Sequence, residues 1–318
     1  MFAEKEIWRN RISDGRHSGI ILFNLAIFLD SFLTLQVIDM QVIDHKIKFG
    51  DAQIYYRTIG NLKKQPILFL PGWPGLYLEK SGVLQELAKY FYVVSLEHPG
   101  LLRSEPLSHY KNIFDQYGEV IRVILKKENL NTKRLIVMGQ SFGGGVASHY
   151  AFRYPDNVKT LVLTDSVIGA GNISVYVRFF FNLGPKVARL VPFLPTLLQK
   201  RVAFAVFGIP STHFKKSSFR DRFGMLDNYT QIVTNAWKDN HRFIEKDYGR
   251  FPILFVWGDR DGKEFNLYGS CNVDDARSVA KKLRAKGKDI RFITVSGGHT
   301  ILYEKPEYVV NEIVKNMS

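Results

Sequence analysis

The stretch RLIVMGQSFGGG at residues 134–145 decides the fold of this chain. Its first half is a short apolar run, typical of a strand buried on both faces of a parallel sheet. The second half contains Gly139-Gln140-Ser141-Phe142-Gly143, and a helical pattern continues from there to residue 153. A G-x-S-x-G motif between a strand and a helix predicts a sharp turn with a serine at its tip.

Such a turn needs very small residues two positions before and two positions after its tip, because the chain folds back on itself there. Gly139 and Gly143 meet that need. The hydroxyl of Ser141 would then stand above the sheet at the N-terminus of a helix, where the dipole favours negative charge. We interpret Ser141 as a candidate nucleophile; the alternative is a glycine-rich turn with an incidental serine.

Apolar runs recur on both sides of this motif, and helical patterns separate them. Strand patterns occupy residues 41–48, 52–58, 66–70, 90–96, 134–139, 160–165, 252–258 and 290–295. Helical patterns occupy residues 76–89, 111–128, 142–153, 273–286 and 305–317. The alternation predicts an α/β fold with a mostly parallel, twisted sheet and helices on both faces. Gly50-Asp51, between the first two runs, predicts a hairpin.

The interval 172–250 interrupts this alternation, since it contains no clear strand pattern and several helical ones. We predict an inserted helical lid domain there, between the two parts of an α/β core at residues 40–171 and 251–318. Within the lid, residues 173–209 carry more aromatic and aliphatic side chains than one helix face needs. The interval also contains thirteen Lys or Arg against five Asp or Glu.

Residues 1–39 precede the first strand pattern and contain one apolar run, at residues 19–29. The run is too short to span a bilayer, which takes about 18 residues or more. Acidic residues in the preceding segment and the lack of a small-residue cleavage site disfavour a signal peptide. We interpret this segment as an extension: either a helix that docks on the protein or touches a membrane, or a poorly ordered stretch.

Composition narrows the functional classes. The single cysteine, Cys271, cannot form an internal disulfide, which favours a reducing compartment, and we expect a cytoplasmic protein. The net charge of +14 would suit an anionic membrane or substrate. No nucleic-acid-binding signature is present, so we expect no nucleic-acid partner. No zinc-ligand spacing or phosphate-binding glycine motif is present either, and we expect no metal and no cofactor.

Residues 40–318 resemble the α/β-hydrolase superfamily, whose members carry a nucleophile, an acid and a histidine in that order along the chain. Ser296-Gly297-Gly298-His299, followed by Glu304-Lys305-Pro306, is similar to the family's histidine loop and the helix start after it. The resemblance implies that His299 takes the serine proton and later returns it to the leaving group.

The acid has three candidates. Gly258-Asp259-Arg260-Asp261 matches the family pattern G-x-x-D, which implies that Asp261 orients the histidine. Asp259 in the same loop is an alternative. Asp165, which follows the preceding strand pattern, is another, because some family members carry the acid there. The loop after Asp261 is longer and more polar than the family pattern, which makes it unusual.

An oxyanion hole needs two backbone N–H groups. Phe142, directly after the candidate nucleophile, would supply one. The resemblance implies that Trp73 supplies the other, from Leu70-Pro71-Gly72-Trp73-Pro74-Gly75, which is similar to the family loop H-G-x-P with Pro71 in place of the histidine. Trp73 as an ordinary core residue remains the alternative.

Residues 97–104, EHPGLLRS, resemble the family's D-x-P-G-x-G-x-S turn, with Glu97 in place of the aspartate and Leu102 in place of a glycine. We interpret this turn as structural. His98 is interpreted as a turn residue, and a second base is the alternative.

The serine argues against haloalkane dehalogenases and epoxide hydrolases, family relatives that attack with aspartate. We expect hydrolysis of a carboxylic ester through an acyl-enzyme, with a small-molecule acyl substrate of apolar character. Two alternatives stay open: cleavage of an amide or C–C bond on the same fold, and a non-catalytic binder of a small hydrophobic ligand. Peripheral membrane contact through the lid or residues 19–29 is a further hypothesis.

Overall fold

A computed structural model of the chain describes residues 41–72, 75, 78–109, 112–130, 135–167, 195–199, 250–262 and 272–317. The predicted N-terminal extension at residues 1–39, nearly all of the predicted lid at residues 172–250 and Trp73 lie outside the described residues. What the sequence indicates about them stays a prediction.

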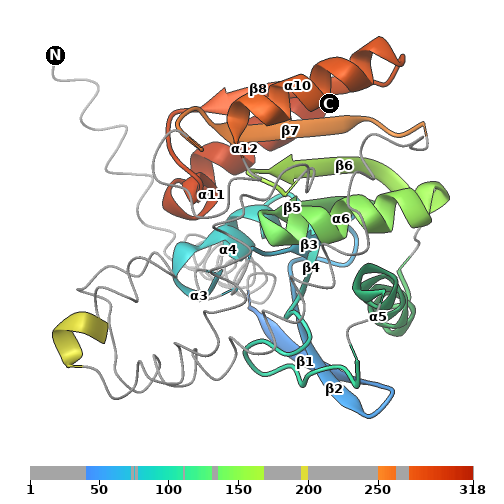
Figure 1. Ribbon diagram of the computed structural model, residues 1–318. Coiled ribbons are helices and arrows are strands. Elements are labelled where there is room, and N and C mark those ends of the chain that lie inside the picture. The colour runs from blue at the N-terminus through green and yellow to red at the C-terminus, as the bar shows by residue number, and fades with distance from the viewer. Residues whose placement is uncertain are drawn as a thin grey trace, which may run out of the picture. The chain divides into compact units, whose positions relative to one another are not determined.

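Eight strands form one sheet in the order β1-β2-β4-β3-β5-β6-β7-β8 (Figure 1). The strands are β1 (Ile43–Phe49), β2 (Ala52–Ile59), β3 (Gln65–Leu70), β4 (Phe91–Leu96), β5 (Leu135–Gln140), β6 (Val158–Thr164), β7 (Ile253–Gly258) and β8 (Ile290–Val295). β2 is antiparallel to β1 and β4, and the other neighbouring pairs are parallel. The predicted fold class is therefore confirmed.

Helices cover both faces of this sheet. The described helices are α3 (Leu78–Ser81), α4 (Val83–Ala88), α5 (Ile113–Lys127), α6 (Phe142–Arg153), α10 (Val273–Ala285), α11 (Ile301–Glu304) and α12 (Pro306–Met317), with a further helical turn at residues 196–199 and a 3₁₀ turn at Pro155–Asn157. α5, α6 and α10 share one hydrophobic core with Leu161 and Leu163 of β6. Val162, equally buried, points the other way, toward the face where α4 and α12 pack on each other and on β4 and β7.

The predicted helix at residues 76–89 is wrong in one respect. The structure has two short helices there, α3 and α4, separated by Gly82. Gly82 has a φ of 72°, a left-handed conformation that ends one helix before the next begins. A period-3.6 pattern of apolar residues continues across this break, so the sequence pattern alone did not reveal it.

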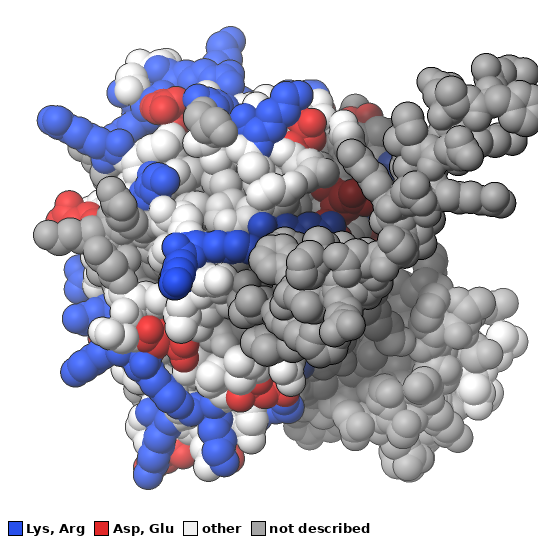
Figure 2. All heavy atoms as spheres, turned by 180° about the vertical axis from the view of Figure 1, so that it is seen from behind, with Lys and Arg blue, Asp and Glu red and all other residues white. Residues whose placement is uncertain are grey.

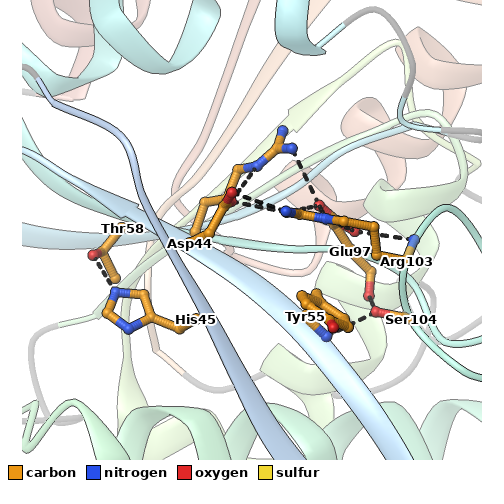
Figure 3. A network of polar contacts seen from close by, with 8 residues as sticks. Asp44, His45, Tyr55, Thr58, Glu97, Arg103 and Ser104 are labelled. Atoms are coloured by element: carbon orange, nitrogen blue, oxygen red, sulfur yellow. Dashed lines mark hydrogen bonds and ion pairs between the residues drawn. The ribbon is translucent and has the colours of Figure 1, made fainter.

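An ion-pair network ties the β1–β2 hairpin to the turn after β4 (Figure 3). Glu97 is buried in it and Arg57 nearly so, whereas the Asp44 and Arg103 side chains are exposed. The carboxylate of Glu97 lies between the guanidinium groups of Arg103 and Arg57, at 2.5 and 3.3 Å. Both guanidinium groups also contact Asp44 on β1, and the hydrogen bonds from Arg103 hold the pKa of Asp44 below its usual range. Ser104 extends the attachment to β2, because its oxygen accepts from the backbone N–H of Tyr55 at 2.9 Å while its hydroxyl donates to the backbone carbonyl of Glu97 at 2.9 Å. The predicted structural interpretation of this turn fits these contacts.

The described surface is basic in several places. On the face seen in Figure 2, Lys and Arg side chains form separate groups with Asp and Glu between them, not one continuous patch. Among the residues that the structure describes, no helix is both long and apolar enough to cross a bilayer.

Candidate active site

Ser141 occupies the tip of a tight turn between β5 and α6. Its φ of 51° and ψ of −121° are unusual for a residue with a side chain and cost about 1–3 kcal/mol. Backbone hydrogen bonds hold this conformation: the N–H of Ser141 donates to the carbonyl of Thr164 at 3.1 Å, and its carbonyl accepts from Val167 at 2.9 Å. The strained backbone thus presents the hydroxyl at the end of the sheet.

Three glycines leave room for this turn. A Cβ at Gly139 would overlap the carbonyl of Gly143, and a Cβ at Gly143 would overlap the carbonyl of Leu70 at the end of β3. Gly144, which our reading of the sequence did not single out, is equally constrained, because a Cβ there would overlap the Ser166 hydroxyl. The turn is therefore packed against the backbone at the end of β3 and against the Ser166 side chain after β6.

Ser141, His299 and Asp261 form one hydrogen-bonded chain. His299 Nε2 lies 2.9 Å from Ser141 Oγ, and His299 Nδ1 lies 3.1 Å from Asp261 Oδ2. An ionised carboxylate only accepts, so Nδ1 donates to Asp261 and Nε2 is left to accept from the serine hydroxyl. The Asp261 side chain is 1% exposed and the His299 side chain 24%. The structure thus brings together three residues that sequence motifs placed in separate loops.

The two alternative acids occupy different positions. Asp259 Oδ1 accepts from the backbone N–H of Gly297 at 3.0 Å, so it shapes the loop that carries His299. Asp165 is fully buried, and its Oδ1 accepts from the N–H of Gly258 at 2.8 Å. Burial, and then the charge of Asp261, raise the pKa of Asp165. Both effects disfavour the charged form of Asp165, whereas Asp261 bonds the imidazole directly.

Comparison with known proteins places this geometry in a family. A family model for the alpha/beta hydrolase fold matches residues 65–306, well over half of the chain. The chain belongs to the α/β-hydrolase fold family. The resemblance seen in the sequence motifs is thereby confirmed.

Relatives within the α/β-hydrolases differ in what they cleave. The chain is 28% identical to Lipase 1 of Psychrobacter immobilis over 243 residues, 70% of each protein. It is 27% identical to a proline iminopeptidase of Lactobacillus helveticus over 135 residues, which are 41% of this chain and 46% of that protein. The chain thus spans about half the length of that relative. A crystal structure of a membrane phospholipase A, a bacterial virulence factor, aligns with a TM-score of 0.66 over 99% of both chains; at 21% identity this shows the fold alone.

Two backbone segments lie beside Ser141: the start of α6 and the loop after β3. Phe142 is the first residue of α6, and the first N–H groups of a helix have no partner within the helix. The N–H of Phe142 therefore lies next to Ser141 at the positive end of the α6 dipole. Pro71 and Gly72 follow β3 directly beside this turn, while Trp73 lies outside the described residues.

His98 packs against the loop that follows β3. Its Nε2 lies 2.7 Å from the carbonyl oxygen of Pro71, to which it donates. The ring is 2% exposed and contacts the rings of Phe142 and Tyr117, with centroids 5.2 and 5.4 Å away. Burial lowers the pKa of His98 to about 4, although the bond to Pro71 opposes the shift. A neutral histidine bonded to a carbonyl is a packing group, so these contacts favour the turn-residue interpretation over a second base.

Because His98 is buried, we expect the folded protein to lose stability in acid. Its pKa is about 4 in the folded protein and about 6.5 in the unfolded chain, so between these values only the unfolded state takes up the proton. The contribution to the free energy of unfolding is complete above pH 6.5. It is lost as the pH falls toward 4, by up to about 3 kcal/mol.

Urea unfolding of wild type and His98→Gln between pH 4 and pH 8 checks this expectation. The difference between the two proteins isolates the histidine, because all other titrating groups are shared. The difference should shrink as the pH falls below 6.5. A constant difference over the whole range would contradict a neutral, buried His98.

Proposed function

We propose that this α/β-hydrolase is a serine hydrolase that cleaves a carboxylic ester through an acyl-enzyme. One observation carries the proposal: the His299 imidazole lies between the Ser141 hydroxyl and the buried Asp261 carboxylate. Its Nε2 is 2.9 Å from the hydroxyl oxygen, and its Nδ1 is 3.1 Å from the carboxylate. This is the relation between nucleophile, base and orienting acid that activates a serine for attack on a carbonyl.

In the proposed reaction, Ser141 Oγ attacks the carbonyl carbon while its proton passes to His299 Nε2. The negative charge on the carbonyl oxygen is stabilised by the backbone N–H groups of Phe142 and Trp73. The C–O bond to the alcohol then breaks, and the alcohol leaves with the proton from His299. Water then attacks the acyl carbon while its proton passes to His299. The bond to Ser141 breaks, the serine oxygen takes that proton back, and the carboxylic acid is released. Asp261 stabilises the imidazolium in both the acylation and the deacylation step.

Amide cleavage is the second candidate, and the proline iminopeptidase similarity favours it over the C–C bond and ligand-binder alternatives. Labelling by a fluorophosphonate probe tests for an activated serine. Turnover of a nitrophenyl ester and of an aminoacyl nitroanilide then separates the two bond types. Ester turnover at least tenfold faster than anilide turnover is the expected result. Absence of labelling and of both activities would overturn the hydrolase proposal and leave a binder.

The apolar excess at residues 173–209 supports an apolar acyl pocket walled by the predicted lid. Each additional CH₂ of a substrate chain buried there would contribute up to ~0.8 kcal/mol. If the transition state is bound as well as the ground state, kcat/KM rises about threefold per methylene until the pocket is full. A series of nitrophenyl esters from acetate to decanoate measures this. Activity that stays flat or falls beyond acetate would mean that these residues pack on the main domain instead.

Phe180→Asp supplies the matched check on the same series. A charge in an apolar wall penalises long chains more than short ones, so the loss should grow from acetate to decanoate. Equal losses across the series would show that Phe180 does not contact the acyl chain.

The proposed setting is the cytoplasm, which the single cysteine supports. Peripheral contact with an anionic membrane is part of the proposal, because the lid interval carries an excess of basic and aromatic residues.

A further inference from the structure

The loop after β3 is held to the histidine loop by a tyrosine. The backbone N–H of Gly72 donates to the hydroxyl of Tyr303 at 3.1 Å, although the two residues are 231 positions apart in the chain. Tyr303 lies in α11, the short helix that begins two residues after His299. The bond therefore connects the loop proposed to carry an oxyanion donor with the loop proposed to carry the base.

The same hydroxyl continues the connection to the serine turn. Tyr303 donates to the side-chain oxygen of Gln140 at 3.3 Å, and the Gln140 amide nitrogen donates to the backbone carbonyl of His299 at 3.1 Å. Gln140 is 2% exposed and directly precedes Ser141. A directional series of hydrogen bonds thus runs from Gly72 through Tyr303 and Gln140 to His299.

Close packing around Gly72 fixes the position of the loop after β3 against Gln140. A Cβ at Gly72 would overlap the Gln140 side-chain oxygen, so this backbone lies against the amide. On its other side, the Pro71 carbonyl accepts from His98. The peptide between Pro71 and Gly72 is therefore bonded through both its carbonyl and its N–H. Its orientation sets the start of the next peptide, which carries the N–H of Trp73.

We propose that Tyr303 and Gln140 are positioning residues, which hold the loop after β3 at a fixed place relative to His299 and Ser141. The proposal rests on the proposed serine hydrolase function. Donors in an oxyanion hole act through their placement relative to the developing charge, and a displacement of about 1 Å is enough to cost up to 10²-fold in rate. Because an oxyanion donor acts on charge that develops in the transition state, we expect a displacement to change kcat more than KM.

Tyr303→Phe tests the proposal, because it removes one oxygen and keeps the ring. We expect kcat on a nitrophenyl ester to fall about tenfold while KM stays within twofold. Affinity for an alkylboronic acid, whose adduct with serine is a tetrahedral anion, should fall by the same factor as kcat/KM. The pH dependence of kcat/KM should keep its midpoint, since the bond between His299 and Asp261 is untouched.

Tyr90→Phe is the matched control. Its hydroxyl donates to Asn311 Oδ1 at 2.7 Å, on an exposed part of α12, and its removal should leave kcat and boronate affinity unchanged. Gln140→Met interrupts the same series at its next member. Combined with Tyr303→Phe, it should give less than the product of the two single losses, because both changes break one connection.

The outcomes separate this inference from the function on which it rests. A wild-type protein without labelling or turnover would overturn both. An active wild type with unchanged kcat and boronate affinity in Tyr303→Phe would overturn the positioning role alone. A Tyr303→Phe protein with lower melting temperature and parallel changes in kcat and KM would also overturn it, since that pattern marks a general structural role.

Discussion

Replacing Ser141 with alanine is expected to lower ester hydrolysis by about 10³–10⁶-fold, by analogy with other serine hydrolases. The change removes the oxygen that lies 2.9 Å from His299 Nε2 and leaves the backbone turn in place. The strained φ of 51° is set by hydrogen bonds to neighbouring segments, not by the hydroxyl, so the melting temperature should hardly move. Steady-state turnover of a nitrophenyl ester and fluorophosphonate labelling measure the effect.

Ser148→Ala is the control for this change. Ser148 is a buried serine on α6, seven positions from Ser141, and it loses the same single oxygen. Labelling and turnover should persist in Ser148→Ala and vanish in Ser141→Ala. Probe labelling that survives in Ser141→Ala would place the nucleophile elsewhere.

Asp261→Asn is expected to lower kcat by about 10⁴-fold, the loss that follows when the orienting acid of such a triad becomes an amide. Asparagine fills the same volume, but its amide can donate to the imidazole and so stabilises the tautomer with its proton on Nε2. That nitrogen could then no longer accept the proton of Ser141. Kinetics on the ester, with circular dichroism to verify folding, measure the loss.

The two other acids provide matched controls for this substitution. Asp259→Asn keeps an oxygen for the N–H of Gly297, and Asp165→Asn keeps one for the N–H of Gly258. Burial raises the pKa of Asp165, and an uncharged amide there keeps the hydrogen bond to Gly258, so we expect this substitution to be tolerated. Both variants should remain within about tenfold of wild type. A 10⁴-fold loss in Asp165→Asn, with Asp261→Asn active, would move the acid to the end of β6.

Local sequence was enough to predict the sheet and the serine turn. Short apolar runs of five to seven residues are typical of strands buried in a parallel sheet. The G-x-S-x-G motif can be recognised because its small residues are required by neighbours in the same turn. Where the physical cause came from elsewhere in the chain, prediction failed. Gly144 is constrained by Ser166, which follows a different strand. The division of residues 76–89 at Gly82 has a local cause, the left-handed φ of 72°, but the apolar pattern that continues across it did not reveal the break.

The choice among the three candidate acids shows what the sequence could not decide. Asp165, Asp259 and Asp261 all follow buried strands, so each lies at the carboxyl edge of the sheet, and the motif G-x-x-D only ranked them. Which carboxylate reaches Nδ1 of His299 depends on how the loop after β7 lies against the loop after β8. The pairing of β7 with β8 sets where these two loops begin. In the structure the distance of 3.1 Å belongs to Asp261.

By itself, the sequence determined the succession of strands and helices along the chain. It also determined the turn that carries Ser141 and the loops in which His299 and an acid occur. Each of these features depends on residues that are close together in the chain. Only the tertiary structure decided which groups from separate loops meet: His299 with Asp261 and Ser141, and Gly72 with Tyr303. A hydrogen bond depends on distances of a few tenths of an ångström. Between residues up to 231 positions apart, such distances are set by the packing of the whole sheet and its helices, which no local pattern contains.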